Sequence, residues 1–330
     1  CLIWLLIDKN KSISNYFYYA LISCFSILVI DGYFQYFTGK NIFGFLLEGI
    51  QITSLFEEKR ILGSYLSRLF PLLFALFLVK KKMKYEIYFV GLLFILVDVL
   101  IFLSGERAAF FFLNLSTVFI IILIKEYQKF RLITFIVAII CITIVSINSV
   151  NLSQRMFQDP ATDMGFVKSS KDSKSGSKES VIFTPVHDSL IRTAYKMFKS
   201  QPILGHGPKM FRIQCKNEKY AVGISPCMTH PHNFYIQLLA ETGIIGFLFL
   251  FSTLCYLLYA SLKQFNSIMF GKKRPFSDYQ ICLLAGILIT VWPISPNGNF
   301  FNNWLMIIYS LPVGFYLQSI YKKNDLKIKH

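Results

Sequence analysis

The amino-acid sequence predicts an all-α polytopic membrane protein, and three observations lead to that fold class. Hydrophobic residues make up 54% of the 330 residues and the mean hydropathy is +0.51, more than the core of a soluble protein of this size needs. Apolar runs of about 18 to 25 residues recur, as a hydrocarbon core about 30 Å thick demands of helices. Basic residues gather in the short segments between these runs.

The apolar runs predict about eight complete transmembrane helices. We expect them at residues 16–37, 62–79, 86–104, 107–124, 132–150, 234–262, 279–295 and 303–321. The first residues, CLIWLLI, have the composition of the tail of a ninth helix. Because the chain begins with Cys1 rather than Met, we expect this N-terminal helix to be truncated.

The formal net charge of +16 is interpreted as a signature of membrane topology, and we expect no nucleic-acid partner. Lys and Arg gather on alternate sides of successive predicted helices, in segments 9–11, 80–84, 125–131, 263–274 and 322–329. An excess of these residues marks cytoplasmic loops. The rule therefore places all five segments inside and residues 151–233 outside, whereas the opposite topology violates it at every segment.

The prediction divides the chain into three parts. Residues 1–150 hold the N-terminal transmembrane helices, 151–233 form one large outside loop, and 234–330 hold the C-terminal transmembrane helices and a cytoplasmic tail. Within the loop, Lys168–Ser180 is rich in Ser and Lys and is expected to be mobile. Asp188–Phe198 places apolar residues near helical spacing and predicts an amphipathic helix.

Two histidines stand where the outside loop meets the next apolar run. Asn233 is a good residue for the N-cap of that helix, and Pro231 biases His230 towards an extended backbone. A neutral imidazole at such a junction can take a proton from a hydroxyl group, so His232 and His230 are candidate general bases. The alternative is that both are interfacial anchors. His187 and His206 have no supporting constellation in the sequence and are interpreted as structural.

Three arginines are candidates for binding phosphate, because the planar guanidinium group matches phosphate and pyrophosphate oxygens. Arg107 lies in a short break between two apolar runs, Arg68 lies inside a predicted helix, and Arg192 lies on the loop helix. The alternative for Arg107 and Arg68 is that they snorkel to lipid headgroups. Arg60 and Arg212 are interpreted as solvated loop residues.

Glu241 is the acidic residue that could match Arg68. It lies about 12 Å along its helix from Asn233 at 1.5 Å per residue, and Arg68 lies about 9 Å along its own helix. The two residues could therefore meet at one depth and pair. Alternatively, the long helix begins above the membrane and leaves Glu241 in water.

The cysteines divide between the predicted helices and the outside loop. Cys215 and Cys227 lie in the loop, where an oxidising compartment would favour a disulfide. With His230 and His232 they could instead bind zinc, although the spacing matches no common zinc module. The cysteines within predicted helices are interpreted as small apolar packing residues: Cys24, Cys141, Cys255 and Cys282.

The sequence lacks the motifs of several enzyme classes. The segment Gly205–Pro208 does not have the GK[ST] ending of a nucleotide-binding P-loop, and neither a serine nucleophile elbow nor an HExxH zinc motif is present. We therefore expect neither a cofactor nor a metal.

Four segments together resemble the bacterial O-antigen ligase and O-antigen polymerase superfamily. They are Leu62–Arg68, Ser104–Ala109, Pro202–Gly207 and His232–Gly246, so the resemblance covers most of the chain after residue 61. The most specific of them is the His-Asn…Glu-x-Gly-x-x-Gly pattern at the end of the large outside loop. The other three are suggestive only together with it.

The resemblance implies a multi-spanning glycosyltransferase of the bacterial inner membrane, and it makes the outside loop periplasmic. Members of the superfamily take glycan from an undecaprenyl-pyrophosphate carrier on the periplasmic face. Ligases pass it to a sugar of the lipid A-core, and polymerases pass it to another repeat unit. The loop histidine of the family corresponds to His232 and its arginines to Arg107 and Arg192. Glu106 departs from the family, which often has a small polar residue at that position.

The resemblance implies a lipid-linked glycan donor, a glycolipid or glycan acceptor, and an inverting single displacement without a cofactor. Ligase and polymerase share these motifs, so the sequence does not separate them. A function of another class is a non-enzymatic flippase of lipid-linked sugars, which would also have many helices and buried arginines but would not need a large loop that ends in histidines. A structural membrane subunit is a weaker reading. The oligomeric state is not predicted.

Overall fold

The computed structural model describes residues 2–328 except 48, 50, 58, 81–83, 164–183 and 295, and it describes side chains as far as Tyr321. It is 73% helical, and the described residues form no strand. Several residues of the predictions lie outside the described ones: Cys1, Lys81, Lys82, Lys329 and the segment 168–180.

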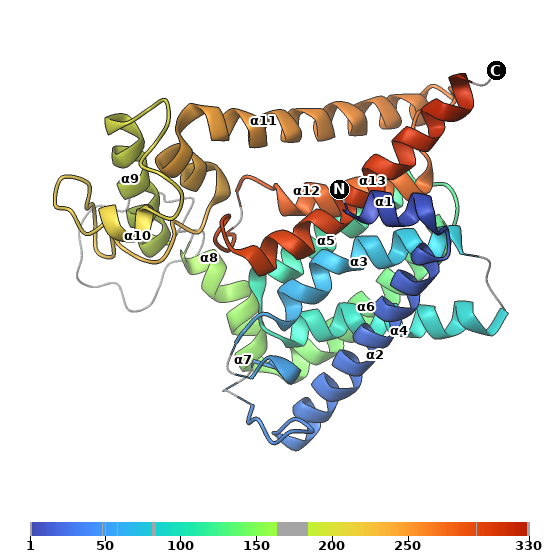
Figure 1. Cartoon of the computed structure of the whole chain (residues 1–330). Helices are drawn as coiled ribbons and strands as arrows, with labels where there is room; N and C mark the ends of the chain where they lie inside the picture. Colours follow the sequence, from blue (N-terminus) through green and yellow to red (C-terminus); the bar gives the residue numbers. More distant parts are fainter. Residues whose placement is uncertain are drawn as a thin grey trace. The chain divides into compact units, whose positions relative to one another are not determined.

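The helices follow the predicted order along the chain (Figure 1). The longer ones are α1 (Leu2–Lys9), α2 (Ile13–Thr38), α3 (Leu62–Val79), α4 (Lys84–Leu103), α5 (Arg107–Leu123), α6 (Gln128–Asn148), α9 (Pro185–Ser200), α11 (Phe234–Met269), α12 (Asp278–Thr290) and α13 (Asn303–Ile328). The short elements are η1 (Ser54–Phe56), α7 (Val150–Ser153), η2 (Gln154–Gln158), α8 (Asp159–Asp163) and α10 (Phe211–Gln214).

Six of these helices are long and apolar enough to cross a membrane: α2, α3, α4, α6, α11 and the Asn303–Tyr321 part of α13. The protein is therefore an all-α polytopic membrane protein, as predicted. The predicted count of eight complete spans is not confirmed, because α5 and α12 are apolar but have only 17 and 13 residues. Helix α12 ends at Thr290, earlier than the predicted residue 295, since Pro293 lacks an N–H and disfavours helical backbone at Trp292.

The described chain divides into two compact units. Unit 1 comprises residues 1–153, 259–290 and 309–330, and unit 2 comprises residues 154–258 and 291–308. The predicted three-part division follows the order of the chain, whereas each unit combines segments that are far apart in the sequence.

Helix α3 is the centre of unit 1. Nearly all of its residues are buried, and it packs against α2, α4, α5 and α12. Gly286 of α12 allows a close approach, because a Cβ atom there would lie 3.3 Å from Pro312 of α13 and 3.5 Å from Pro71 of α3. Small residues permit such close packing of helices where no water drives association.

A buried ion pair joins α4 and α6 in unit 1. Arg131 donates to Asp98 through Nη1 at 2.7 Å and Nη2 at 3.2 Å, and Nη2 also donates to Thr117 at 2.7 Å. The Arg131 side chain is fully buried. The sequence analysis grouped Arg131 with the basic residues of segment 125–131, whereas the structure neutralises its charge with a buried carboxylate that the sequence analysis did not single out.

Unit 2 is built around α9, whose amphipathic character the sequence predicts correctly. Pro185 occupies the first turn, where its missing N–H costs nothing. The apolar face packs into one core cluster: Leu190, Ala194, Met197, Phe211, Cys215, Tyr220 and Ala240. This cluster fixes α9 and the 201–227 segment against the first turns of α11.

Candidate functional site

Helix α11 is broken at Gly243, where the sequence predicts one continuous helix. This residue has φ 65° and ψ −161°, a backbone conformation that favours glycine. A Cβ atom on it would collide with the backbone of Ile203. The 201–207 turn therefore lies directly on α11, where the N–H groups of His206 and Gly207 donate to the carbonyls of Ala240 and Glu241 at 3.0 and 2.8 Å.

Glu241 anchors this turn from the first segment of α11. Its Oε1 accepts a hydrogen bond from the Phe211 N–H at 2.8 Å, and its Oε2 accepts one from Gln237 Nε2 at 2.9 Å. The side chain has no exposed surface, so the alternative that Glu241 is in water is wrong. Its pairing with Arg68 stays a prediction, because Arg68 belongs to unit 1 and Glu241 to unit 2.

Three histidines gather beside the beginning of α11. The rings of His230 and His232 have centroids 4.1 Å apart, and the His187 ring lies edge-on to His232 at 5.5 Å. His187 comes from the first turn of α9, where its Nδ1 lies 2.7 Å from the Thr184 hydroxyl. Sequence reasoning missed His187 as a member of this cluster. His187 immediately precedes the predicted loop helix, and no local pattern in the sequence places it beside His232.

The 291–302 segment holds the two adjacent histidines in place. His232 has φ 56°, a left-handed conformation that is uncommon for a non-glycine residue. Its carbonyl accepts a hydrogen bond from the Asn297 N–H at 2.8 Å, and the Asn297 carbonyl lies 3.3 Å from His230 Nε2. One asparagine therefore bonds to both histidines.

Asn233 fixes the beginning of α11. Its Oδ1 accepts hydrogen bonds from the N–H groups of Tyr235 and Ile236 at 3.0 and 3.2 Å, which is the predicted N-cap geometry. Its Nδ2 donates to the Pro293 carbonyl at 2.6 Å. The residue next to His232 thus caps the helix and ties it to the 291–302 segment.

A second polar layer lies one helical turn further along α11. The fully buried Gln237 donates through Nε2 to Glu241 and, at 2.8 Å, to Asn299 Oδ1. Its Oε1 accepts a hydrogen bond from the Phe300 N–H at 2.9 Å. A connected hydrogen-bond network therefore supports the beginning of α11, where the histidines lie. Such a network restricts the rotamers of the side chains that take part in it.

Burial keeps the histidines neutral. It lowers the pKa of His187 and of His230, and it is the main reason why the pKa of His232 falls to about 4. The two neighbouring imidazoles lower the pKa of His232 further. The positive charge of Arg212 contributes to the lowered pKa of His230, so this arginine bears on the cluster although the sequence analysis set it aside as solvated.

Arg192 lies on α9 in unit 2, on the same helix as His187. Its Nε pairs with Asp188 Oδ2 at 2.7 Å, and its side chain is 54% exposed. An exposed ion pair of this kind is worth about 0–1 kcal/mol.

Arg107 is the first residue of α5 in unit 1 and is partly exposed. Its neighbour Glu106 has a structural role that explains the departure from the family pattern. The Glu106 carboxylate accepts hydrogen bonds from the Gly63 N–H at 2.6 Å, the Ser64 N–H at 3.0 Å and the Ser64 hydroxyl at 2.6 Å. It thus caps the N-terminus of α3, where a negative charge is favourable.

Arg68 lies within unit 1 rather than at a headgroup surface. Its Nη1 donates to the Ile289 carbonyl at 3.1 Å, and its guanidinium carbon lies 4.5 Å from the ring centroids of both Phe112 and Tyr309. The residue is 6% exposed. Aromatic faces stabilise a cation in such surroundings.

Cys215 and Cys227 form a disulfide, with their Cα atoms 5.0 Å apart. Cys215 belongs to the unit 2 core cluster, so the bond attaches the 216–228 segment to that core. The two sulfur atoms are joined to each other and are not thiolate ligands, which removes them from the zinc alternative. Among the residues that the structure describes, no group of three or more His, Cys, Asp or Glu residues could hold a metal ion.

Comparison with known families agrees with these features. The family described as O-antigen ligase matches residues 90–251, which run from α4 to the broken helix α11 and include all three clustered histidines. No curated protein and no solved structure matches the chain. The protein is therefore a multi-spanning membrane protein with an O-antigen ligase domain at residues 90–251, consistent with the O-antigen ligase superfamily.

Proposed function

We propose that this protein is an O-antigen ligase-like glycosyltransferase. In this proposal it moves glycan from undecaprenyl pyrophosphate to a lipid A-core or similar acceptor sugar at the periplasmic face of the bacterial inner membrane. The family match supports a ligase or polymerase type of function in general. The observation that carries the finer proposal is the neutral His232 at the beginning of α11, flanked by two further imidazoles.

In the proposed reaction, an acceptor hydroxyl oxygen attacks the anomeric carbon of the donor. The bond from that carbon to the pyrophosphate oxygen breaks, and undecaprenyl pyrophosphate leaves with the electron pair. The hydroxyl proton passes to a ring nitrogen of His232, which is free to accept it because the ring is neutral. A single displacement of this kind inverts the anomeric centre. His230 is the second candidate for the base.

The lowered pKa of His232 is a feature of the protein without donor. A bound pyrophosphate brings negative charge close to the imidazole cluster, and a nearby opposite charge favours the protonated form. Donor binding therefore raises the pKa of His232 towards the neutral range, where a general base works best. The partial burial of His232 strengthens this effect, because charges interact more strongly where water is excluded.

Three arginines are proposed to bind the donor pyrophosphate. Arg107 and Arg192 would form bidentate hydrogen bonds with phosphate oxygens and stabilise the charge that develops on the leaving group. Arg192 lies on the same helix as His187 of the histidine cluster, which supports its place in this proposal. Arg68 is proposed to stabilise the same charge from within the helices of unit 1, with its orientation fixed by Phe112 and Tyr309.

The test is transfer by the purified full chain, given lipid-linked donor and lipid A-core acceptor. We expect His232→Ala to lower transfer by about 10²–10⁴-fold, the usual cost of losing an acid–base residue. His206→Gln is the matched control, since His206 lies in the same unit outside the cluster and bonds to Ser200 and the Met197 carbonyl. Transfer by His232→Ala at the rate of the control would refute the assignment.

The same assay distinguishes the other functions. A polymerase would extend a second lipid-linked repeat unit in preference to the lipid A-core acceptor. A flippase would move the donor across the bilayer without forming any new glycosidic bond. Product bearing the opposite anomeric configuration to the donor would support the single displacement, and retained configuration would contradict it.

A further inference from the structure

Unit 1 contains a cavity of about 730 Å³ that the proposed reaction does not use. It lies where α3 ends at Leu78 and Val79, beside the turn between α5 and α6 and the connection from α11 to α12. Two of these segments carry residues of the basic clusters 125–131 and 263–274, and the third ends next to the cluster 80–84; the positive-inside rule assigns all three clusters to the cytoplasmic side. The cavity therefore lies at ends of membrane helices that the sequence-based topology assigns to the cytoplasmic side.

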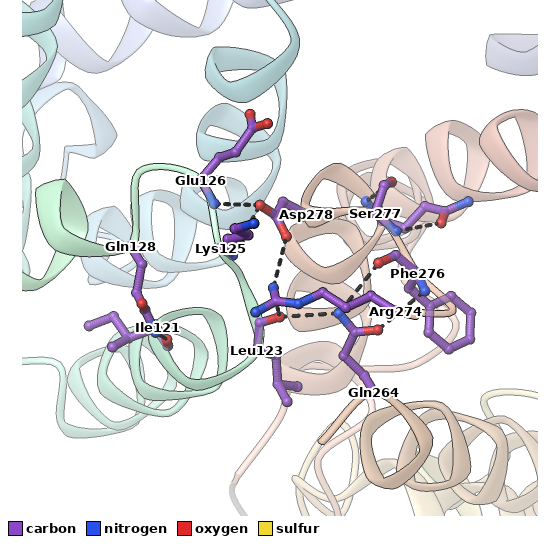
Figure 2. Close-up of polar contacts among 11 residues, drawn as sticks. Ile121, Leu123, Lys125, Glu126, Gln128, Gln264, Arg274, Phe276, Ser277 and Asp278 are labelled. Carbon is purple, nitrogen blue, oxygen red and sulfur yellow. Dashed lines mark hydrogen bonds and ion pairs between the residues drawn. The ribbon is translucent and has the colours of Figure 1, made fainter. Parts of the chain in front are cut away.

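Hydrogen bonds to the backbone hold the walls of this cavity together. Asp278 Oδ2 accepts from the N–H groups of Lys125 and Glu126 at 3.0 and 2.6 Å (Figure 2). The fully buried Gln264 donates to the carbonyls of Leu123 at 3.2 Å and Phe276 at 3.3 Å, and it accepts from the Phe276 N–H at 3.2 Å. The α5–α6 turn and the α11–α12 connection are thus fastened to each other without using a lysine side chain.

Three cationic side chains line the cavity: Lys125, Lys273 and Arg274. Lys125 and Lys273 are exposed, and Arg274 makes only long contacts, at 3.6 Å to Asp278 and 3.4 Å to the Leu123 carbonyl. The charge of Asp278 is already met by two backbone N–H groups, and the Glu126 carboxylate points away from it (Figure 2). The cations therefore exceed the anions, and an anionic ligand would find donors that are not committed to strong ion pairs.

The remaining walls are apolar. Leu78, Pro275 and Phe276 line the cavity, and Val79 beside them is 57% exposed. We propose that the cavity binds an anionic phospholipid, with its phosphate between Lys125, Lys273 and Arg274 and the first part of its acyl chains along Leu78 and Val79. Basic pockets between membrane helices on the cytoplasmic side recognise such headgroups. The apolar wall favours a phospholipid over inorganic phosphate, which offers the same oxygens but no hydrocarbon.

The experiment measures how tightly the purified full chain in neutral detergent binds short-chain phosphatidylglycerol, by native mass spectrometry and by thermal stabilisation. The test variant is the double substitution Lys125→Gln/Lys273→Gln. The matched control is Lys129→Gln/Lys272→Gln, which removes the same charge from the same two clusters but from residues that do not line the cavity. Each basic residue is worth about fivefold in affinity for anionic lipid. We expect the test variant to lose about 30-fold and the control less than about twofold.

A third variant gives a change in the opposite direction. Glu126→Gln removes a carboxylate from the cavity lining and should strengthen phosphatidylglycerol binding by about fivefold, a gain that misfolding cannot produce. Equal losses in the two double variants would overturn the proposal, because the effect would then be diffuse surface charge. Inorganic phosphate that stabilises the protein as well as phosphatidylglycerol does, or equal binding of phosphatidylcholine, would also overturn it.

Discussion

The carboxylate of Glu106 offers a sharp test of the site described above, because it lies beside an arginine proposed to bind the donor. Three hydrogen bonds from Gly63 and Ser64 end on this one carboxylate at the N-terminus of α3. Hydrogen bonds to charged groups contribute about 1.5–3 kcal/mol each, and the interaction of a charge with a helix terminus adds about 0.3–1 kcal/mol. In Glu106→Gln one oxygen remains to accept and the amide N–H₂ faces other donors.

We therefore expect Glu106→Gln to lower the free energy of unfolding by about 2–4 kcal/mol, since an amide oxygen in the place of Oε2 keeps two of the three bonds, while the bond to Gly63 and the charge are lost. The measurement is thermal or denaturant unfolding of the purified protein in detergent. Glu57→Gln is the control, because Glu57 is an exposed carboxylate of the segment that precedes α3. The Michaelis constant for donor should stay unchanged in the folded fraction. A variant as stable as the wild type, with a changed donor constant, would refute the cap and place Glu106 in the donor site.

The remaining predictions concern the proposed donor site and its surroundings. Arg107→Lys should impair transfer clearly and Arg107→Ala should impair it more, since lysine keeps the charge but cannot donate two parallel hydrogen bonds as guanidinium does. Donor binding by the lysine variant at wild-type strength would contradict this. The kcat/KM for transfer should hold from neutral pH downwards and fall only as the pH drops through about 4, where His232 takes a proton; a fall near pH 6.5 would contradict the buried imidazole. Because unfolded histidine protonates near pH 6.5, stability should decline between pH 6.5 and about 4, and less so in His232→Ala. Peptide mapping without reductant should recover Cys215 linked to Cys227, and alkylation of both thiols in native membranes would exclude the bond. Transfer should survive EDTA, and strict dependence on added Mg²⁺ or Mn²⁺ would require another mechanism.

The positions of the membrane helices could be predicted well because hydropathy and length determine them. The predicted bounds of the helix at 62–79 agree with α3 at both ends. The predicted helix at 107–124 differs from α5 by one residue. Breaks within a helix were harder to predict. A glycine such as Gly243 in an apolar run is compatible with a continuous helix, and only its close contact with Ile203 requires the break.

The candidate site could be predicted only where its residues adjoin in the sequence. His230, His232 and Asn233 lie together in one motif, so the sequence could predict that they stand at the beginning of a helix. His187 and Asn297 join them through tertiary contacts that no local pattern encodes. Charge partners were hidden for the same reason. Arg131 resembles a loop cation because Asp98 lies on another helix. The capping role of Glu106 is not visible in the sequence because Gly63 and Ser64 lie 43 and 42 residues before it, at the start of α3.

The buried pair of Asp98 and Arg131 constrains how this protein can be made. A carboxylate or guanidinium group at the centre of a lone helix costs about 2.5–3.5 kcal/mol on insertion. Helix α4 leaves the ribosome before α6, and its Asp98 precedes Arg131 by 33 residues. Asp98 therefore has no partner until the α5–α6 hairpin has also been synthesised. The strongly apolar α4 can bear this cost, but Asp98 gains its partner only when α6 has been made, so the packing of α4 against α6 forms after all three helices have been synthesised.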